Sequence, residues 1–226
     1  MHLRGRVERF ADRVEAGRSL GALVAARLVD PIASPAVVLG LPRGGVPVAA
    51  EVARAVNAPL DVLLVRKIGV PGQPELAMGA VAAIGDVVEV VKNEVVVGRL
   101  RIPDQVFRAV LDEELVELRR RTVAYRGDRP APDLAGRTVI VVDDGLATGS
   151  TMRAAAAAVR RRKPAAVIVA VPVGATDTCA RLRAEVDDVI CALSPHPFRA
   201  VHQGYDDFTQ TTDGQVLACL AYDRRG

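Results

Sequence analysis

Aromatic residues are scarce in this sequence of 226 residues. Aromatic side chains make up 3% of it, and Trp does not occur. A hydrophobic core must therefore be built from Val, Ala, Leu and Ile, which is typical of buried parallel strands covered by helices. A chain of this length can bury a substantial core. We therefore expect an α/β fold.

Cysteine pairs and long apolar runs are also missing. Cys179, Cys191 and Cys219 form no CxxC pair, which argues against a disulfide framework and a thiolate zinc site. The apolar stretch 165–175 contains Pro172 and is too short to span a bilayer. Charged residues occur among the first nine positions, where a signal peptide has its apolar segment. We expect an unexported, cytoplasmic protein without a membrane span.

Charge of one sign is not in large excess either. The net charge is +3 with 25% charged residues, which gives no strong attraction to polyanions. The basic clusters 119–121 and 160–163 are interpreted as solvated cations near helix C-termini, where they complement the helix dipole. Binding to nucleic acid is therefore not expected.

Apolar periodicity predicts alternating strands and helices. We predict helix over the first thirty residues with a break at Gly17, and a loop without secondary structure at 68–78, which is rich in Gly and Pro. The predicted strands are 36–41, 60–65, 80–84, 87–91, 138–142, 166–171 and 189–193, and the other predicted helices are 46–56, a long one from Pro103, one ending near 162 and 178–185. This alternation predicts a mainly parallel sheet flanked by helices.

The most informative motif follows the predicted strand 138–142. Asp143 and Asp144 come first, and a helix start follows a turn made of Gly145, Leu146, Ala147, Thr148, Gly149, Ser150 and Thr151. Glycine lets a backbone approach a ligand closely, and a helix N-terminus favours phosphate. Adjacent carboxylates suit sugar hydroxyls or hydrated Mg²⁺ instead. The motif lacks the Lys of a Walker A loop, so it predicts a site for a phosphorylated sugar.

This strand, acidic pair and Thr-Gly turn resemble the signature of the type I phosphoribosyltransferases. The resemblance implies that family's α/β fold with a small hood, in one domain over 1–226. The core would be about 32–193, and the hood would come from the N-terminal helix region and about 194–226.

The resemblance also implies roles for the motif. Residues 145–151 would hold the 5′-phosphate of phosphoribosyl pyrophosphate (PRPP), and Asp143 and Asp144 would be catalytic residues that hold the ribose hydroxyls. The implied cofactor is Mg²⁺, bound mainly through the ligand, with the two aspartates as candidate metal ligands.

A second segment, 41–46, resembles the family's pyrophosphate loop, in which a peptide is often cis without proline. The resemblance implies that Arg43, Gly44 and Gly45 bind pyrophosphate. A guanidinium suits phosphate oxygens, and two glycines permit close approach. The plainer interpretation is an ordinary tight turn between strand and helix.

A third segment supplies basic residues at the end of the predicted strand 60–65. Arg66 and Lys67 match the place where the family has a basic residue near pyrophosphate, and Lys67 is a candidate catalytic residue. The segment 68–78 would then be the mobile loop that closes over the sugar. A solvated charge at a strand end is the alternative for Lys67.

The acceptor is less well defined by the sequence. Phe198, Tyr205 and Phe208 lie in one short stretch of the expected hood and are candidates for stacking on a planar acceptor, with hood packing as the alternative. Ala147 stands where family members acting on 6-oxopurines carry an acidic residue for proton transfer. Guanine and hypoxanthine are therefore disfavoured.

The resemblance implies that the protein transfers the phosphoribosyl group from PRPP to a nitrogen nucleophile and releases pyrophosphate in a Mg²⁺-dependent reaction of nucleotide metabolism. Its expected ligands are PRPP and an unidentified acceptor, and its expected assembly is a homodimer. The alternative is a non-catalytic regulator that binds PRPP or a nucleotide.

Overall fold

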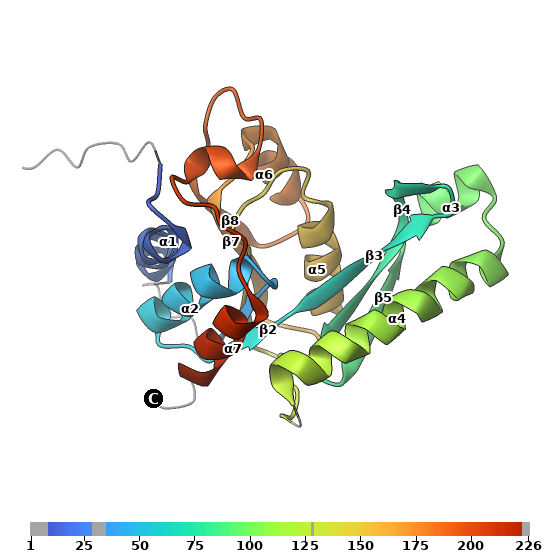
Figure 1. Cartoon of the computed structure of the whole chain (residues 1–226), viewed down its shortest axis with the longest axis horizontal. Helices are drawn as coiled ribbons and strands as arrows, with labels where there is room; N and C mark the ends of the chain where they lie inside the picture. The colour runs from blue at the N-terminus through green and yellow to red at the C-terminus, as the bar shows by residue number, and fades with distance from the viewer. Residues whose placement is uncertain (1–8, 29–34, 128, 223–226) are drawn as a thin grey trace, which may run out of the picture.

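A parallel sheet of five strands forms the centre of the computed structural model, which describes residues 9–28, 35–127 and 129–222. The strand order is β2-β1-β6-β7-β8. Figure 1 shows the helices around this sheet and, to its right, a second sheet with the long helix α4 (Asp104–Arg126). The strands are β1 (Ala36–Gly40), β2 (Leu60–Val62), β6 (Thr138–Val142), β7 (Ala166–Val173) and β8 (Asp188–Leu193). The predicted α/β fold with a parallel sheet is confirmed.

Alternating side chains divide the core into two layers, because successive residues of a strand face opposite sides of the sheet. Val37 and Leu39 pack on one side and Val38 on the other. The helices of the first side are α5 (Ser150–Arg161) and α6 (Thr176–Leu182), and those of the second are α1 (Arg13–Arg27), α2 (Gly45–Val56) and α7 (Asp213–Tyr222). Both faces of the sheet are thus covered with aliphatic side chains.

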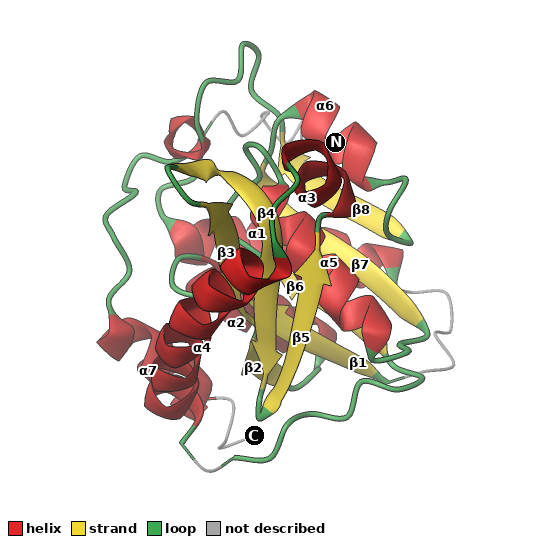
Figure 2. Cartoon of the chain, turned by 90° about the vertical axis from the view of Figure 1, so that its right-hand side faces the viewer, coloured by secondary structure: helices red, strands yellow, loops and turns green. Residues whose placement is uncertain are grey.

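A second, antiparallel sheet has three strands, β3 (Leu64–Val70), β4 (Gln73–Ile84) and β5 (Val87–Lys92). Helix α4 (Asp104–Arg126) covers one face and packs Phe107 against it, while Ala82 and Ile84 join the core layer of α5 on the other (Figure 2). The short α3 (Glu94–Leu100) connects β5 to α4. The predicted hairpin around residues 85–86 and the long helix after Pro103 are confirmed.

The predicted loop at 68–78 is wrong. Strand β3 continues through Val70, and β4 begins at Gln73, its direct partner across the hairpin. Only two residues turn the chain, with Gly72 at a φ of +78°. The Gly and Pro content was misleading because Ile68 and Met78 are fully buried in the apolar cluster that contains Phe107 of α4.

Two other boundaries also differ from prediction. The predicted strand 60–65 is two strands, because the chain leaves the parallel sheet after Val62 and enters the antiparallel sheet at Leu64. Helix α1 has no break at Gly17, which is buried where a Cβ would lie 2.8 Å from the Cβ of Glu51 in α2. The helices α3 and α7 were not predicted.

Helix α1 begins at Arg13, because the carboxylate of Asp12 accepts hydrogen bonds from the amides of Val14 and Glu15. The earlier part of the predicted N-terminal helix, residues 1–8, lies outside the described residues, as do 29–34 and the last part of the expected hood, 223–226. Within the described part of the chain, no helix is both long and apolar enough to cross a membrane.

Candidate functional site

The carboxyl edge of the parallel sheet brings two of the sequence motifs together. Strands β1 and β6 are neighbours that end in register at Gly40 and Val142. The amide of Leu41 donates to the carbonyl of Val142 at 2.9 Å, so the turn 41–45 and the turn 143–149 leave the sheet side by side. The peptide between Pro42 and Arg43 is cis, as the resemblance implies.

Gly44 and Gly45 pack directly against the acidic pair. A Cβ on Gly44 would lie 1.9 Å from Oδ2 of Asp144, and a Cβ on Gly45 would lie 2.8 Å from the Cα of Asp143. A side chain at Gly44 would have to displace the carboxylate of Asp144, and one at Gly45 would have to displace the backbone at Asp143. The backbone of the 43–45 segment and the two carboxylates therefore form one continuous surface.

Asp144 is held by residues from both ends of the chain. Arg13 in α1 donates to Oδ2 of Asp144 from Nε at 2.9 Å and lies 2.8 Å from it through Nη2. The hydroxyl of Tyr205 donates to the carbonyl oxygen of Asp144 at 2.6 Å. The sequence analysis missed Arg13, because no local pattern relates two residues that are 131 positions apart.

Burial raises the pKa of Asp143 well above its usual range, and the negative charge of Asp144 raises it further. Burial also raises the pKa of Asp144, although the guanidinium of Arg13 opposes this effect. Oδ1 of Asp143 accepts the amide of Asp144 at 2.9 Å. Crowded carboxylates of this kind gain from hydrogen-bond donors or a cation, so the pair is suited to hold hydroxyl groups or a metal ion.

The turn 145–151 is anchored to the core by hydrogen bonds on one side and exposed on the other. Leu146 is buried and its amide donates to the carbonyl of Val173 at 2.8 Å. The hydroxyl of Thr178 donates to the carbonyl of Ala147 at 2.8 Å, and Gly149 has a φ of +77° just before α5. Thr148 is exposed above these anchors. The hydroxyls of Thr148 and Ser150 lie 3.3 Å apart. A turn that carries hydroxyl donors at the N-terminus of a twelve-residue helix can accommodate a phosphate.

The predicted basic residues do not converge on one point. Nη1 of Arg43 lies 3.9 Å from Oδ1 of Asp213, and Arg66 pairs with Glu114 of α4 at 2.6 Å. Lys67 is half-buried and lines a separate cavity of about 280 Å³ that also reaches Ser150. Both Arg66 and Lys67 lie within β3 of the antiparallel sheet, not at the edge of the parallel one.

The three aromatic residues predicted for the acceptor cluster together near Phe10. The ring of Tyr205 is buried, 6.0 Å from that of Phe10 and 4.9 Å from that of Phe208, and Phe198 packs in the same cluster. The guanidinium of Arg13 lies 4.0 Å from the centroid of Phe208. A contact between these rings and an acceptor stays a prediction.

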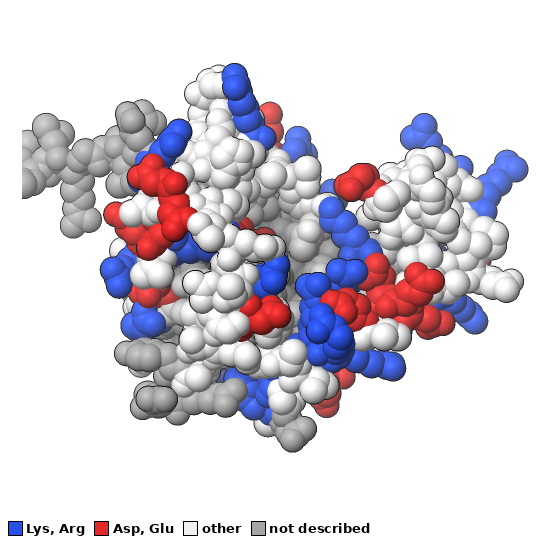
Figure 3. All heavy atoms as spheres, viewed as in Figure 1, with Lys and Arg blue, Asp and Glu red and all other residues white. Residues whose placement is uncertain are grey.

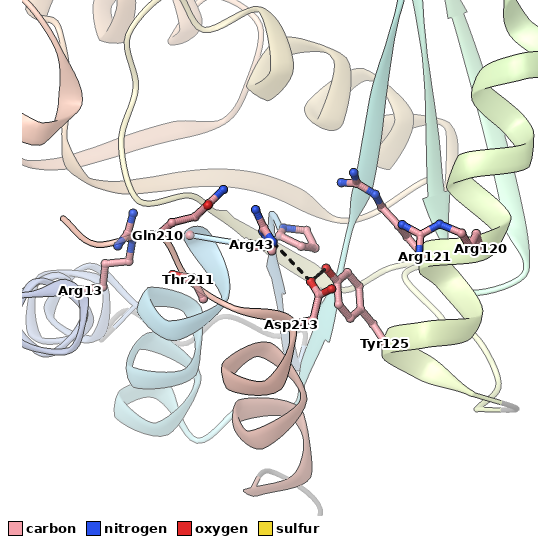
Figure 4. A pocket seen from close by; sticks show the side chains of 10 residues that line it. Arg13, Arg43, Arg120, Arg121, Tyr125, Gln210, Thr211 and Asp213 are labelled. Carbon is pink, nitrogen blue, oxygen red and sulfur yellow. Dashed lines mark hydrogen bonds and ion pairs between the residues drawn. The ribbon is translucent and has the colours of Figure 1, made fainter.

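A cavity of about 370 Å³ lies beside the turn 42–44 and was not predicted (Figure 4). Its lining includes Arg120, Arg121 and Tyr125 of α4. The sequence analysis interpreted the cluster 119–121 as solvated, and Arg119 and Arg120 are indeed exposed. The sequence does not show that Arg120 and Arg121 also border a cavity, because that depends on which face the helix turns to it. Basic side chains gather around the hollow between the core and α4 (Figure 3).

A complete metal site does not preexist in the part of the chain that the structure describes. No group of three or more His, Cys, Asp or Glu side chains there could hold an ion. Asp143 and Asp144 still offer hard oxygen ligands of the kind that Mg²⁺ prefers, so the pair fits an ion whose other ligands come from a bound phosphate ester and water.

Comparison with known proteins identifies a matching family model, two curated relatives and a similar solved structure. Residues 15–207 match the family described as the phosphoribosyl transferase domain. Two curated relatives from Mycobacterium tuberculosis, strains CDC 1551 and H37Rv, are named provisionally as phosphoribosyl transferases, and each is 47% identical over 93% of this chain. The alignment covers 46% of each relative, so the chain spans about half the length of the curated relatives it matches.

The crystal structure of the protein TT1426 from Thermus thermophilus is also similar. It is 42% identical, aligns over 95% of this chain and 98% of its own, and superimposes with a TM-score of 0.81.

Proposed function

The chain belongs to the phosphoribosyl transferase family, and on that premise we propose that it transfers the phosphoribosyl group of PRPP to a nitrogen nucleophile and releases pyrophosphate. The observation that carries the proposal is the contact between Gly44 and the carboxylate of Asp144. It places the 43–45 turn, the acidic pair and the phosphate-compatible turn 145–151 on one edge of the sheet, where open α/β sheets bind their ligands.

Each part of this edge has a distinct role in the proposal. Within the turn 145–151, the hydroxyls and the amides other than that of Leu146 bind the 5′-phosphate, and Asp143 and Asp144 accept hydrogen bonds from the ribose hydroxyls. Arg43 and the amide of Gly44 bind the pyrophosphate, where positive charge stabilises the leaving group as the bond at the anomeric carbon breaks. Gly45 keeps the turn close to Asp143, and its own amide donates to the carbonyl of Leu41 at 3.0 Å. Catalysis then comes mainly from positioning and charge stabilisation.

We propose a partial Mg²⁺ site at Asp143 and Asp144, because Arg13 already occupies one carboxylate oxygen of Asp144. Bound Mg²⁺ would neutralise charge on the pyrophosphate. Lys67 as a residue that contacts the leaving group, a homodimer and a cytoplasmic location remain predictions.

The acceptor in this proposal is not a 6-oxopurine. Ala147 occupies an exposed position of the turn and has no group that can exchange a proton with a base. Its carbonyl is engaged by Thr178, so the backbone does not substitute for a carboxylate at this position. An adenine-type base or another nitrogen nucleophile fits better.

Calorimetry with PRPP and Mg²⁺ tests the site directly. We expect the wild type to bind and the double variant Asp143→Asn/Asp144→Asn to bind at least about tenfold more weakly, since a hydrogen bond to a charged group contributes roughly 1.5–3 kcal/mol. The matched control is Asp112→Asn/Glu113→Gln, which neutralises an adjacent exposed acidic pair on α4. Unchanged affinity in the first variant would refute the assignment.

Pyrophosphate release with a panel of purines, pyrimidines, pyridine acids and amines tests the reaction. Release that depends on one acceptor supports the enzyme. PRPP binding without release for any acceptor would favour the alternative, a regulator that keeps the binding site without the chemistry.

A further inference from the structure

Two of the three cysteines meet beside the turn 145–151, and the proposed function uses neither of them. Cys179 lies in α6 and is buried, and Cys191 lies in β8 and is partly exposed. Both pack in the same layer of the core. A Cβ on Gly174 would lie 2.9 Å from Sγ of Cys179 and 3.1 Å from Sγ of Cys191. One point in the connection between β7 and α6 therefore contacts both sulfur atoms.

The surroundings of the two sulfur atoms make them chemically different. The thiol of Cys179 donates a hydrogen bond to the sulfur of Cys191, which lowers the pKa of Cys191 to about 7. The same hydrogen bond, and after it burial, raises the pKa of Cys179. The guanidinium of Arg183 lowers the pKa of both thiols. Since the thiolate is the reactive form of cysteine, Cys191 is the nucleophile of the pair near neutral pH.

Cys191 is also the more accessible member of the pair. Cys179 is only 3% exposed. Sγ of Cys191 lies 3.3 Å from the carbonyl oxygen of Leu193 and 3.5 Å from the hydroxyl of Ser194, which is an exposed residue. A small oxidant that approaches from solvent therefore meets Cys191 first, with Cys179 directly behind it.

The third cysteine lacks this arrangement. Cys219 lies in α7 and packs in the core layer on the other side of the sheet. Burial raises the pKa of its thiol. Cys219 is thus an internal control for the chemistry of the other two cysteines.

We propose that Cys191 and Cys179 form a reversible redox site, in which hydrogen peroxide oxidises Cys191 and Cys179 then closes a disulfide with it. The thiolate of Cys191 attacks one peroxide oxygen, the O–O bond breaks, and a sulfenic acid and water result. The sulfur of Cys179 gives up its proton, attacks the sulfenic sulfur and displaces a second water. Two thiols and one peroxide thus give one disulfide and two waters: the sulfurs lose two electrons and the peroxide gains them.

Backbone and side-chain hydrogen bonds connect this site to the turn 145–151. The amide of Leu146 donates to the carbonyl of Val173, and the amide of Ala175 donates back to the carbonyl of Leu146 at 2.9 Å. Thr178, the neighbour of Cys179, holds the carbonyl of Ala147. A disulfide restricts the open states of the segment that it closes, so oxidation should oppose local separation of α6 from β8 and make the turn 145–151 open less often.

Thiol counting after peroxide treatment tests the chemistry. The full chain is exposed to hydrogen peroxide and denatured with a maleimide, and mass spectrometry counts the labelled thiols. We expect the wild type to lose two of its three labelled thiols and to recover both after dithiothreitol. Trypsin should release a cross-link between the peptides 163–181 and 184–199, which contain Cys179 and Cys191.

Two variants separate the roles of the cysteines. Cys219→Ser is the matched control and should form the same cross-link as the wild type. Cys179→Ser should form none, and dimedone, which traps sulfenic acids, should label its Cys191. A wild type that keeps three labelled thiols would overturn the proposal. So would a cross-link through Cys219, a cross-link of the peptide 184–199 with itself, or dimedone on a cysteine other than Cys191.

Hydrogen exchange measures the effect on the turn. Amides of the turn 145–151 should exchange at least about tenfold more slowly in the oxidised wild type than in the reduced one. Cys191→Ser, treated with peroxide in the same way, should show no such change. Equal exchange in the two redox states of the wild type would overturn the coupling to the turn. Neither experiment requires PRPP, so the redox site and the proposed transferase activity are tested separately.

Discussion

At the residue scale, the site depends on a position where any side chain would displace a carboxylate. The Cβ that alanine adds at Gly44 would lie 1.9 Å from Oδ2 of Asp144. That contact must push Asp144 away from Arg13 or open the turn. Gly98 in α3 has no atom within 4 Å of the corresponding point, so it provides a matched control.

We predict that Gly44→Ala weakens PRPP binding at least about tenfold, which corresponds to roughly 1.4 kcal/mol. The reason is the loss of contact between the 43–45 turn and the acidic pair. Calorimetry with Mg²⁺ measures the change, and Gly98→Ala should bind as the wild type does. Equal affinity in both variants would mean that this contact has no part in binding.

The burial of Asp143 beside Asp144 predicts that ionisation of Asp143 lowers the stability of the folded chain. Its pKa is higher in the folded chain than in the unfolded one, so the folded state binds more protons above the ordinary pKa of about 3.9. The free energy of unfolding should therefore fall as pH rises from about 4 through the raised pKa.

We predict that Asp143→Asn stabilises the chain at pH 7 by about 1 kcal/mol while it weakens PRPP binding. Urea unfolding at pH 4 and pH 7 measures the effect, and the gain should be larger at pH 7. A variant that is less stable than the wild type at both values would show that the carboxylate is needed for folding.

At the scale of elements, one buried ion pair fixes the end of α4 to the core. Nε and Nη2 of Arg126 lie 3.0 Å and 2.7 Å from the carboxylate oxygens of Asp61, which belongs to β2 of the parallel sheet. The same guanidinium donates to the carbonyls of Arg129 and Pro130 in the following linker. Arg126 and Asp61 are 4% and 7% exposed. This pair therefore helps to set where α4 places its arginines.

We predict that Asp61→Ala lowers the free energy of unfolding by about 3–5 kcal/mol, because removing one partner leaves a buried charge uncompensated. Asp112→Ala on the exposed face of α4 is the control and should change stability by less than about 0.5 kcal/mol. Urea denaturation measures both. A small effect of Asp61→Ala would mean that Arg126 finds other partners in the linker.

The sequence could predict those elements whose evidence is local. Strand β6 and the turn 143–151 carry apolar, acidic and glycine residues in one continuous run, so their place and order followed from the pattern. The hairpin of β3 and β4 could not be found in this way, because it depends on Ile68 and Met78 meeting α4 and on pairing across the turn. The contacts of Arg13 with Asp144 and of α4 with the cavity depend on tertiary packing, and residues far apart in the sequence make them.

At the scale of the whole molecule, the proposed ligand site joins parts that are otherwise separate. The core sheet supplies the acidic pair, the turn after β1 supplies Arg43 and Gly44, and α1 and the chain before α7 supply Arg13 and Tyr205, which hold Asp144. A ligand that contacts several of these parts binds the folded chain and not the unfolded one. Its binding energy is then added to the stability of the entire fold.

We predict that PRPP with Mg²⁺ at about 100 times its Kd raises the free energy of unfolding by about 2.7 kcal/mol. Urea denaturation at 25 °C measures the increase without heating the ligand. Gly44→Ala at the same PRPP concentration should show only about half of it, because a tenfold weaker Kd leaves the ligand at about ten times Kd. Gly98→Ala should show the full increase. An increase that is equal in both variants would place PRPP elsewhere on the molecule, since only the first variant changes the carboxyl edge of the sheet.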